Sequence, residues 1–210
     1  GTQPHFFDWE MERKGWDPEH IPPIGEYKNM ERFGRSYFAD GAYARDQAHK
    51  PIREQKDAVG HAVCNMYLMC GATDVAAETG DQSLLDAMHT LWDSVTLRRM
   101  YITGGIGSCD AGERFTFDYD LPNENAYNET CASIGLVFWA DRMLQFGADR
   151  KYSDIMEKAL YNGIISGLSL SGDHFFYANH LASNNGIYQN KVQRNNRMRP
   201  DRQQWFRVSC

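Results

Sequence analysis

Residues 129–146, with the sequence ETCASIGLVFWADRMLQF, place the strongest constraint on what this chain can fold into. The segment is apolar almost all round, and its length corresponds to roughly five helical turns. A helix without a polar face is stable in water only when neighbouring elements cover it on all sides. The rest of the chain must therefore supply the helices that surround this one.

Three further segments, 57–81, 83–100 and 152–160, repeat apolar residues at the i, i+3, i+4, i+7 spacing of a core-facing helix. Gly80 and Asp81 are expected to close the first of them. The predicted apolar stripes consist of Val63, Met66, Tyr67 and Cys70 in the first segment, Leu84, Met88, Leu91, Trp92 and Val95 in the second, and Tyr152, Ile155, Met156, Ala159 and Leu160 in the third.

Residues 167–181 show a strand pattern instead, with Phe175 and Tyr177 alternating against Phe176, and they predict a short β-hairpin that turns at Gly172-Asp173. The proline-rich first 55 residues predict a long surface segment with one short helix near residues 27–46. The fold class is therefore mainly α. Bundle, solenoid and α/α-barrel architectures remain open, although no internal repeat favours a solenoid.

Composition limits the classes of function. A chain of 210 residues with 42% hydrophobic and 13% aromatic residues supports one globular domain. A net charge of −6 and a pI near 5.6 argue against nucleic-acid and anionic-membrane partners. No apolar run is long enough for a membrane span, and residues 1–10 lack a signal pattern. Five cysteines without a CxxC pair indicate a reducing, cytoplasmic location.

The loop between the helices predicted at 83–100 and 129–146 contains the side chains best suited to catalysis or metal binding. Residues 103–133 contain Glu113, Asp118, Asp120, Glu124, Glu129 and Cys131. The glycines of this loop do not form a phosphate-binding pattern, because GxxxxGK[ST] is missing. A basic run at 191–207 is interpreted as a solvated linker.

Glu129 and Cys131 are two residues apart, so they diverge within a regular helix and share a target only if Asn128 caps the helix or the loop stays extended up to that point. A thiol in a first helical turn is favoured as the thiolate, which binds Zn²⁺. From the residues alone, however, the simpler interpretation is that Glu129 is a solvated acid and that Cys131 is buried like a small hydrophobic residue.

Four motifs, in this order along the chain, resemble those of glycoside hydrolase family 127, the β-L-arabinofuranosidase group. They are EQKDAVGHAV at 54–63, the whole stretch 101–133, YSDIMEKALYNGIISGLSL at 152–170 and WFRVSC at 205–210. The resemblance extends from about Pro51 to Cys210. It implies that residues 1–210 are part of an (α/α)6 catalytic barrel, with the remaining barrel helices and the following β-rich regions in a longer parent enzyme.

The resemblance also implies a role for individual residues. The glutamate of GERFTF, Glu113, is the general acid/base, and Cys210 is the nucleophile. The family's Zn²⁺ ligands fall on Glu129, Cys131 and Cys210, with a further cysteine expected just beyond Cys210. Substrate contacts fall on His61, Glu129, Tyr177 and, more weakly, Glu157.

The expected function is therefore that of a retaining glycoside hydrolase that releases L-arabinofuranose or a related sugar from a glycoside. Zinc would keep the nucleophile as a thiolate, whereas a free thiol with its usual pKa of about 8.5 is mostly protonated at neutral pH. Two alternatives stay open, namely the same chemistry on another furanoside or an acidic branched sugar, and a non-catalytic helical carbohydrate-binding protein with a structural zinc. Assembly into a homo-oligomer is also left open.

Overall fold

The computed structural model describes residues 13, 15, 44, 45, 47–183 and 201–204. Cys210, most of the predicted helix at 27–46 and most of the basic run at 191–207 lie outside these residues. The elements are η3 (Ile52–Glu54), α4 (Ala62–Thr79), α5 (Gln82–Arg98), α6 (Thr130–Leu144), α7 (Arg150–Lys158), η4 (Ala159–Ile164), η5 (Ile165–Gly167), β1 (His174–Phe175) and β2 (Gln203–Gln204). The prediction of a mainly α-helical chain with a short antiparallel strand pair is confirmed.

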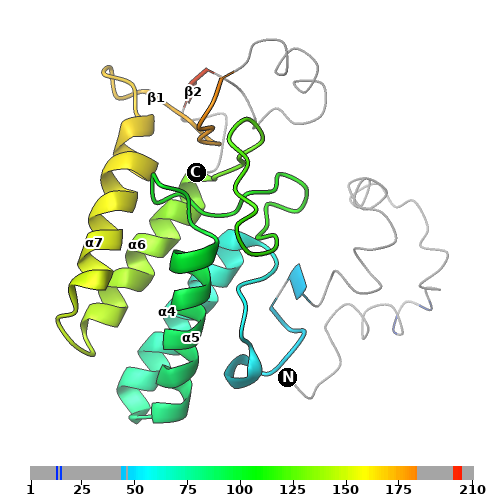
Figure 1. The fold of residues 1–210 in the computed structure, drawn as a ribbon, viewed down its shortest axis with the longest axis vertical. Helices are drawn as coiled ribbons and strands as arrows, with labels where there is room; N and C mark the ends of the chain where they lie inside the picture. The colour runs from blue at the N-terminus through cyan, green and yellow to red at the C-terminus, as the bar shows by residue number, and fades with distance from the viewer. Residues whose placement is uncertain (1–12, 14, 16–43, 46, 184–200, 205–210) are drawn as a thin grey trace.

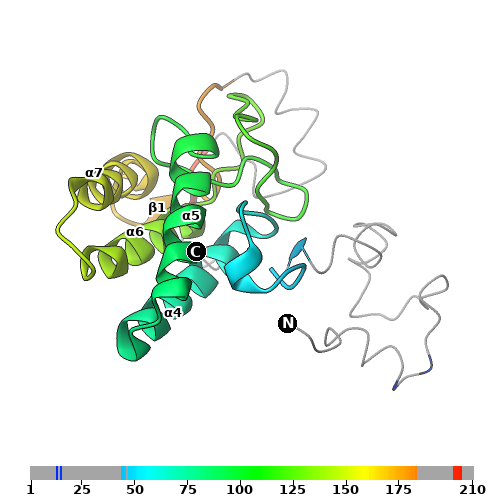
Figure 2. The ribbon, with the colours of Figure 1, turned by 60° about the horizontal axis from the view of Figure 1, so that its bottom comes forward.

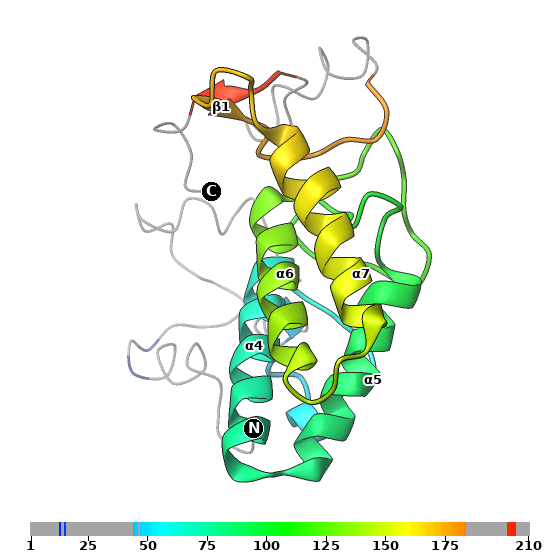
Figure 3. The same cartoon turned by 90° about the vertical axis from the view of Figure 1, so that its left-hand side faces the viewer.

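The four α-helices run alternately up and down (Figure 1). Helix α6 packs against both α4 and α7, and α4 packs against α5, so the predicted burial of α6 is confirmed on these two sides. Its remaining face is open, since Phe138 is 48% exposed. Figure 3 shows α6 lying alongside α4 on one side and α7 on the other. Seen from the angle of Figure 2, the loop residues 101–128 gather at the end of the helices where α4 and α6 begin.

Local sequence signals set the ends of α4 and α5. Gly80 ends α4 in the left-handed conformation, with a φ of 65° that glycine adopts without steric cost. The next residue, Asp81, begins α5 by accepting a hydrogen bond from the backbone N–H of Leu84 at 3.0 Å. These two residues close α4 as the sequence predicts.

All four α-helices meet at one buried point. The indole of Trp139 in α6 donates a hydrogen bond to the hydroxyl of Thr73 in α4 at 3.0 Å. Trp92 of α5 packs edge-on against Trp139, with ring centroids 5.0 Å apart, and against Tyr152 of α7 at 4.8 Å. This aromatic cluster holds the helices together, since edge-to-face pairs add to the hydrophobic effect of burial.

The predicted stripe of α4 is wrong at Tyr67. This side chain is 51% exposed, while Met66 and Met69 are fully buried. The cause is the close approach of α6, because a Cβ on Gly135 would lie 2.7 Å from the Cβ of Met66. Apolar residues surround much of α4, so its sequence does not indicate which of them the neighbouring helices cover.

The end of α7 departs from α-helical geometry. Residues Ala159–Ile164 form a π-helical stretch, followed by a 3-10 turn. The backbone of Ala159 lies so close to Gly104 that a Cβ there would come within 2.8 Å of it. The loop that follows α5 thus packs directly on the π-helical turn, and such local widening often accompanies functional sites.

The predicted hairpin is confirmed in part. Hydrogen bonds from Ser169 N to His174 O (2.9 Å) and from Phe176 N to Gly167 O (3.2 Å) join the two sides of the turn at Gly172, but residues 168–171 do not form a regular strand. Strand β1 pairs antiparallel with β2 instead, in the register His174 to Gln204 and Phe175 to Gln203. Residues 165–167 continue the helical segment as a 3-10 turn, which shortens the chain available for a strand before Gly172. The predicted alternation is retained, since Phe175 and Tyr177 are buried and Phe176 is only partly so.

Candidate active site

Backbone pairing brings separate segments together at the N-terminal ends of α4 and α6. Residues 60–62 run beside 113–115, through hydrogen bonds from Ala62 N to Glu113 O (2.9 Å) and from Phe115 N to Gly60 O (3.0 Å). Residues 127–130 run beside 177–179 in the same way, with Thr130 N bonded to Tyr177 O at 3.0 Å. The two helix N-termini carry partial positive charge, which favours anionic side chains at this end.

Glu113 contacts His61 directly. The Nε2 atom of His61 lies 2.8 Å from Oε2 of Glu113, and both side chains are largely buried. His61 is also the N-cap of α4, where its Nδ1 accepts a hydrogen bond from the backbone N–H of Cys64 at 3.4 Å. With Nδ1 as the acceptor, we assign the ring proton to Nε2, which donates to Glu113.

Glu113 also has an unusual backbone conformation. Its φ of 52° lies in the left-handed region, where a side chain with a Cβ is disfavoured. The residue sits in a tight turn closed by paired hydrogen bonds between Cys109 and Arg114 (3.2 and 3.0 Å). Backbone strain of this kind typically occurs at functional sites, where the surrounding structure enforces it.

The second oxygen of Glu113 contacts Tyr127. The Tyr127 hydroxyl donates to Oε1 at 2.7 Å, so both carboxyl oxygens of Glu113 have a partner within the protein. Tyr127 is only 1% exposed. Burial, together with the negative charge of Glu129, raises the pKa of its hydroxyl far above the usual range, so Tyr127 stays protonated as a donor.

Glu129 is buried, with 4% exposure, and not the solvated acid that the residues alone favoured. It is itself the N-cap of α6, in an extended conformation (φ −62°, ψ 134°), and its side chain makes no capping hydrogen bond. The option that Asn128 caps the helix is therefore wrong. The extended conformation is limited to Glu129, because Asn128 before it is left-handed, with a φ of 43°. Burial raises the pKa of the Glu129 carboxyl, while a hydrogen bond from Tyr177 and the nearby His61 oppose that shift.

Cys131 lies in the first turn of α6, half-buried, where the helix dipole favours a thiolate. As a thiolate, Cys131 would be able to bind a metal through its sulfur. The carboxylate of Glu129 and the sulfur of Cys131 are suitable donors for Zn²⁺, and a cation would offset the cost of burying the Glu129 charge. Two of the expected zinc ligands, Glu129 and Cys131, thus lie in the described part of the chain and have suitable donor atoms. Cys210 lies outside the described residues.

A second donor set contains His61, Glu113 and Glu129, whose ligand atoms all lie within 4.8 Å of one another. Two donors on one tetrahedral Zn²⁺ stand about 3.3 Å apart, given metal–ligand distances of about 2.0–2.1 Å. The 2.8 Å contact between His61 and Glu113 is shorter than that and has the length of a hydrogen bond. The arrangement of these three residues therefore suits hydrogen bonding and proton transfer better than metal coordination.

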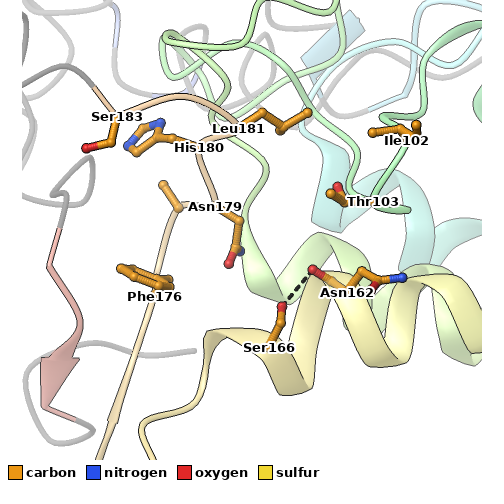
Figure 4. Close-up of a pocket in the computed structure, with 10 residues that line it drawn as sticks. Ile102, Thr103, Asn162, Ser166, Phe176, Asn179, His180, Leu181 and Ser183 are labelled. Carbon is orange, nitrogen blue, oxygen red and sulfur yellow. Dashed lines mark hydrogen bonds between the residues drawn. The ribbon is translucent and has the colours of Figure 1, made fainter.

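Glu157 is not brought into this cluster. It is exposed on α7, whereas His61, Glu113, Glu129 and Tyr177 converge. A pocket of about 470 Å³ lies between residues 176–183 and the turns η4 and η5, which contribute Asn162 and Ser166 (Figure 4). Phe176 and Asn179 line it, whereas His61, Glu113, Glu129 and Tyr177 do not.

Sequence reasoning missed two residues that support the cluster. Tyr127 was available in the motif AYNETCAS, since a tyrosine two residues before a functional glutamate is a candidate hydrogen-bond donor. Asn179 donates to the carbonyl of Asn128 and to the hydroxyl of Thr130, both at 2.9 Å, and so fixes the approach to α6. No local signal predicts that contact, because it joins segments about fifty residues apart.

Fold and site together define a helical domain that carries paired carboxyl groups, a histidine and a tyrosine on the loops at one end. Residues 10–210 match the catalytic domain of the glycoside hydrolase family 127 β-L-arabinofuranosidases. The chain belongs to this family, as the resemblance of its motifs implies. None of the helices in the described part of the chain combines the length and apolarity that crossing a bilayer requires.

Individual relatives agree with this assignment. A non-reducing end β-L-arabinofuranosidase of Bifidobacterium longum subsp. longum is 42% identical over 210 residues, which are all of this chain and 29% of that protein. The crystal structure of Ara127N-Se, a GH127 β-L-arabinofuranosidase from Geobacillus stearothermophilus T6, superposes with a TM-score of 0.80 at 48% identity, covering 98% of this chain and 29% of the other. A GH127 β-arabinofuranosidase structure gives 0.66 at 45% identity, covering 77% and 26%. The chain thus spans less than a third of the length of these relatives.

Proposed function

We propose that the protein is a retaining glycoside hydrolase that removes L-arabinofuranose, or a closely related sugar, from the non-reducing end of a glycoside. The observation that carries the proposal is the Glu113 carboxyl, which is bonded at one oxygen to His61 and at the other to Tyr127 and lies beside the buried Glu129. Membership of the family, and the printed names of its relatives, supply the substrate class.

In this proposal Glu113 acts in both halves of the reaction. It gives its proton to the glycosidic oxygen as the bond to the sugar breaks, and in the second step it takes a proton from the attacking water. Cys210 attacks the anomeric carbon. Zinc bound by Glu129, Cys131 and Cys210 would keep Cys210 as the nucleophilic thiolate. Tyr177 and His61 would contact the sugar from either side of this pair.

A second candidate for the nucleophile follows from the geometry of the described residues. Retaining glycosidases with two carboxylates hold them about 5–5.5 Å apart. The nearest ligand atoms of Glu113 and Glu129 lie within 4.8 Å, so Glu129 is close enough for that role. The two candidates differ in where the sugar is attached during turnover, on the sulfur of Cys210 or on the carboxylate of Glu129.

The test uses the complete enzyme and an aryl β-L-arabinofuranoside. We expect Cys210→Ser and Glu113→Gln to lose most turnover, and Glu124→Gln, an exposed acid in the same loop, to retain it. Mapping the sugar-bearing peptide of a trapped intermediate by mass spectrometry separates Cys210 from Glu129. Full turnover by Cys210→Ser would exclude the cysteine nucleophile, and turnover only on other furanosides or acidic sugars would change the substrate class.

A further inference from the structure

Both oxygens of the Glu113 carboxyl are held by the fold before any substrate binds. The Tyr127 hydroxyl donates to Oε1 at 2.7 Å, and Nε2 of His61 lies 2.8 Å from Oε2. A carboxylate has about four lone-pair sites, and these two contacts use one on each oxygen. The two contacts, one on each oxygen, thereby fix the plane of the carboxyl.

Tyr127 is itself rigidly placed. Its backbone N–H donates to the carbonyl of Ser108 at 3.1 Å, and its carbonyl accepts from the N–H of Asn179 at 3.2 Å. Its ring is buried next to that of Tyr177, with centroids 6.4 Å apart. The ring is therefore fixed in place, with its hydroxyl against Glu113.

The strength of this contact depends on the charge of Glu113. A hydrogen bond to an ionised carboxylate is roughly twice as strong as one between neutral groups. When Glu113 gives its proton to the leaving oxygen, its O–H bond breaks, the new O–H bond forms on the leaving alcohol, and the electron pair of the glycosidic bond moves to that oxygen. Negative charge appears on Glu113 during this step, so the Tyr127 contact becomes stronger in the transition state than in the ground state.

We propose that Tyr127 is a positioning residue for the acid step, holding the Glu113 carboxyl in its reactive orientation and stabilising the carboxylate that forms when the proton leaves. Tyr127 acts through Glu113 and does not touch the sugar. The inference rests on the proposed role of Glu113 as the acid. It assigns the residue that orients Glu113 and predicts which half of the reaction depends on it.

The test exploits the leaving group. A 4-nitrophenolate departs with little protonation, whereas a methoxide leaving group needs the proton from Glu113. In the complete enzyme, we expect Tyr127→Phe to lower kcat/KM for methyl β-L-arabinofuranoside by about 10- to 100-fold, part of the 10²–10⁴ typical of general acid–base catalysis. For the 4-nitrophenyl glycoside the loss should stay within about 3-fold, because that step makes little use of the acid.

Tyr119→Phe is the matched control, since Tyr119 lies in the same loop but is 70% exposed. Equal losses on both substrates would overturn the proposal, because a merely structural role lowers them together. No loss on either would overturn it as well. Thermal midpoints of the variants show whether Tyr127→Phe folds like the parent protein.

A crystal structure of Tyr127→Phe gives a readout that does not depend on activity. We expect the Glu113 carboxyl to rotate away from its present orientation, and an unchanged carboxyl would refute the positioning role. Failure of the proposed function gives a different result, namely a wild-type enzyme that hydrolyses neither glycoside. In that case the crystal structure still decides whether Tyr127 holds Glu113.

Discussion

Adding one methyl group at Gly135 should destabilise the protein although alanine is the better helix former. In the middle of a helix, alanine is favoured over glycine by about 1 kcal/mol. At Gly135 the new Cβ would lie 2.7 Å from the Cβ of Met66 and 3.3 Å from its Cγ. Met66 is fully buried, so its side chain cannot swing into solvent to relieve the contact.

The magnitude follows from these two opposing effects. Forcing an extra methyl group into a packed core costs about 1–3 kcal/mol, and the backbone-side Cβ contact places Gly135 at the upper end of that range. After the gain of about 1 kcal/mol in helix propensity, Gly135→Ala should be destabilised by about 1–2 kcal/mol. The damage should be confined to the packing of α6 on α4.

Gly71→Ala is the matched control, because Gly71 is also within a helix but a Cβ there would meet nothing within 4 Å. We expect it to stabilise the protein by about 1 kcal/mol. Thermal unfolding of the complete enzyme followed by circular dichroism, with hydrogen exchange of the α4 and α6 amides, measures both variants. A Gly135→Ala protein as stable as Gly71→Ala would refute the packing argument.

Two further perturbations probe the buried groups. Burial raises the pKa of the Cys70 thiol to about 11, so the alkylation rate of Cys70 should increase with pH up to about that value. It should stay below the rate of the exposed Cys64, as peptide mapping of labelled thiols would show. Equal rates for the two cysteines at pH 8 would contradict this. Thr73→Val should cost about 1–3 kcal/mol, since it preserves shape but leaves the indole N–H of Trp139 without an acceptor, whereas Thr79→Val on the exposed surface should stay within about 0.5 kcal/mol in the same unfolding assay.

Raised pH should also destabilise the fold through Cys70. A thiol with a folded pKa near 11 and a reference value of 9.0 keeps its proton longer in the folded state than in the unfolded state. Below pH 9 the two states bind the same proton and its contribution is complete. Between about pH 9 and 11 the unfolded chain releases the proton first, so stability falls as the pH rises.

The sequence by itself determined the helices and their ends. Apolar spacing located α4, α5, α6 and α7, and Gly80-Asp81 marked a boundary, because caps and periodicity depend on residues within one or two helical turns. The motif resemblance also identified the family. The packing of α6 against neighbouring helices followed from its apolar composition, although its sequence did not show that the face with Phe138 stays open.

Only the tertiary structure decided which residues meet. The contact between His61 and Glu113 joins positions 52 residues apart, and the hydrogen bond between Tyr177 and Glu129 spans a similar separation. Likewise, the exposure of Tyr67 and the pairing of β1 with β2 depend on packing between distant segments. Hydrophobic burial is non-directional, so a pattern shows that a residue can be buried without showing against what, and the partners are fixed only when the helices and loops close together.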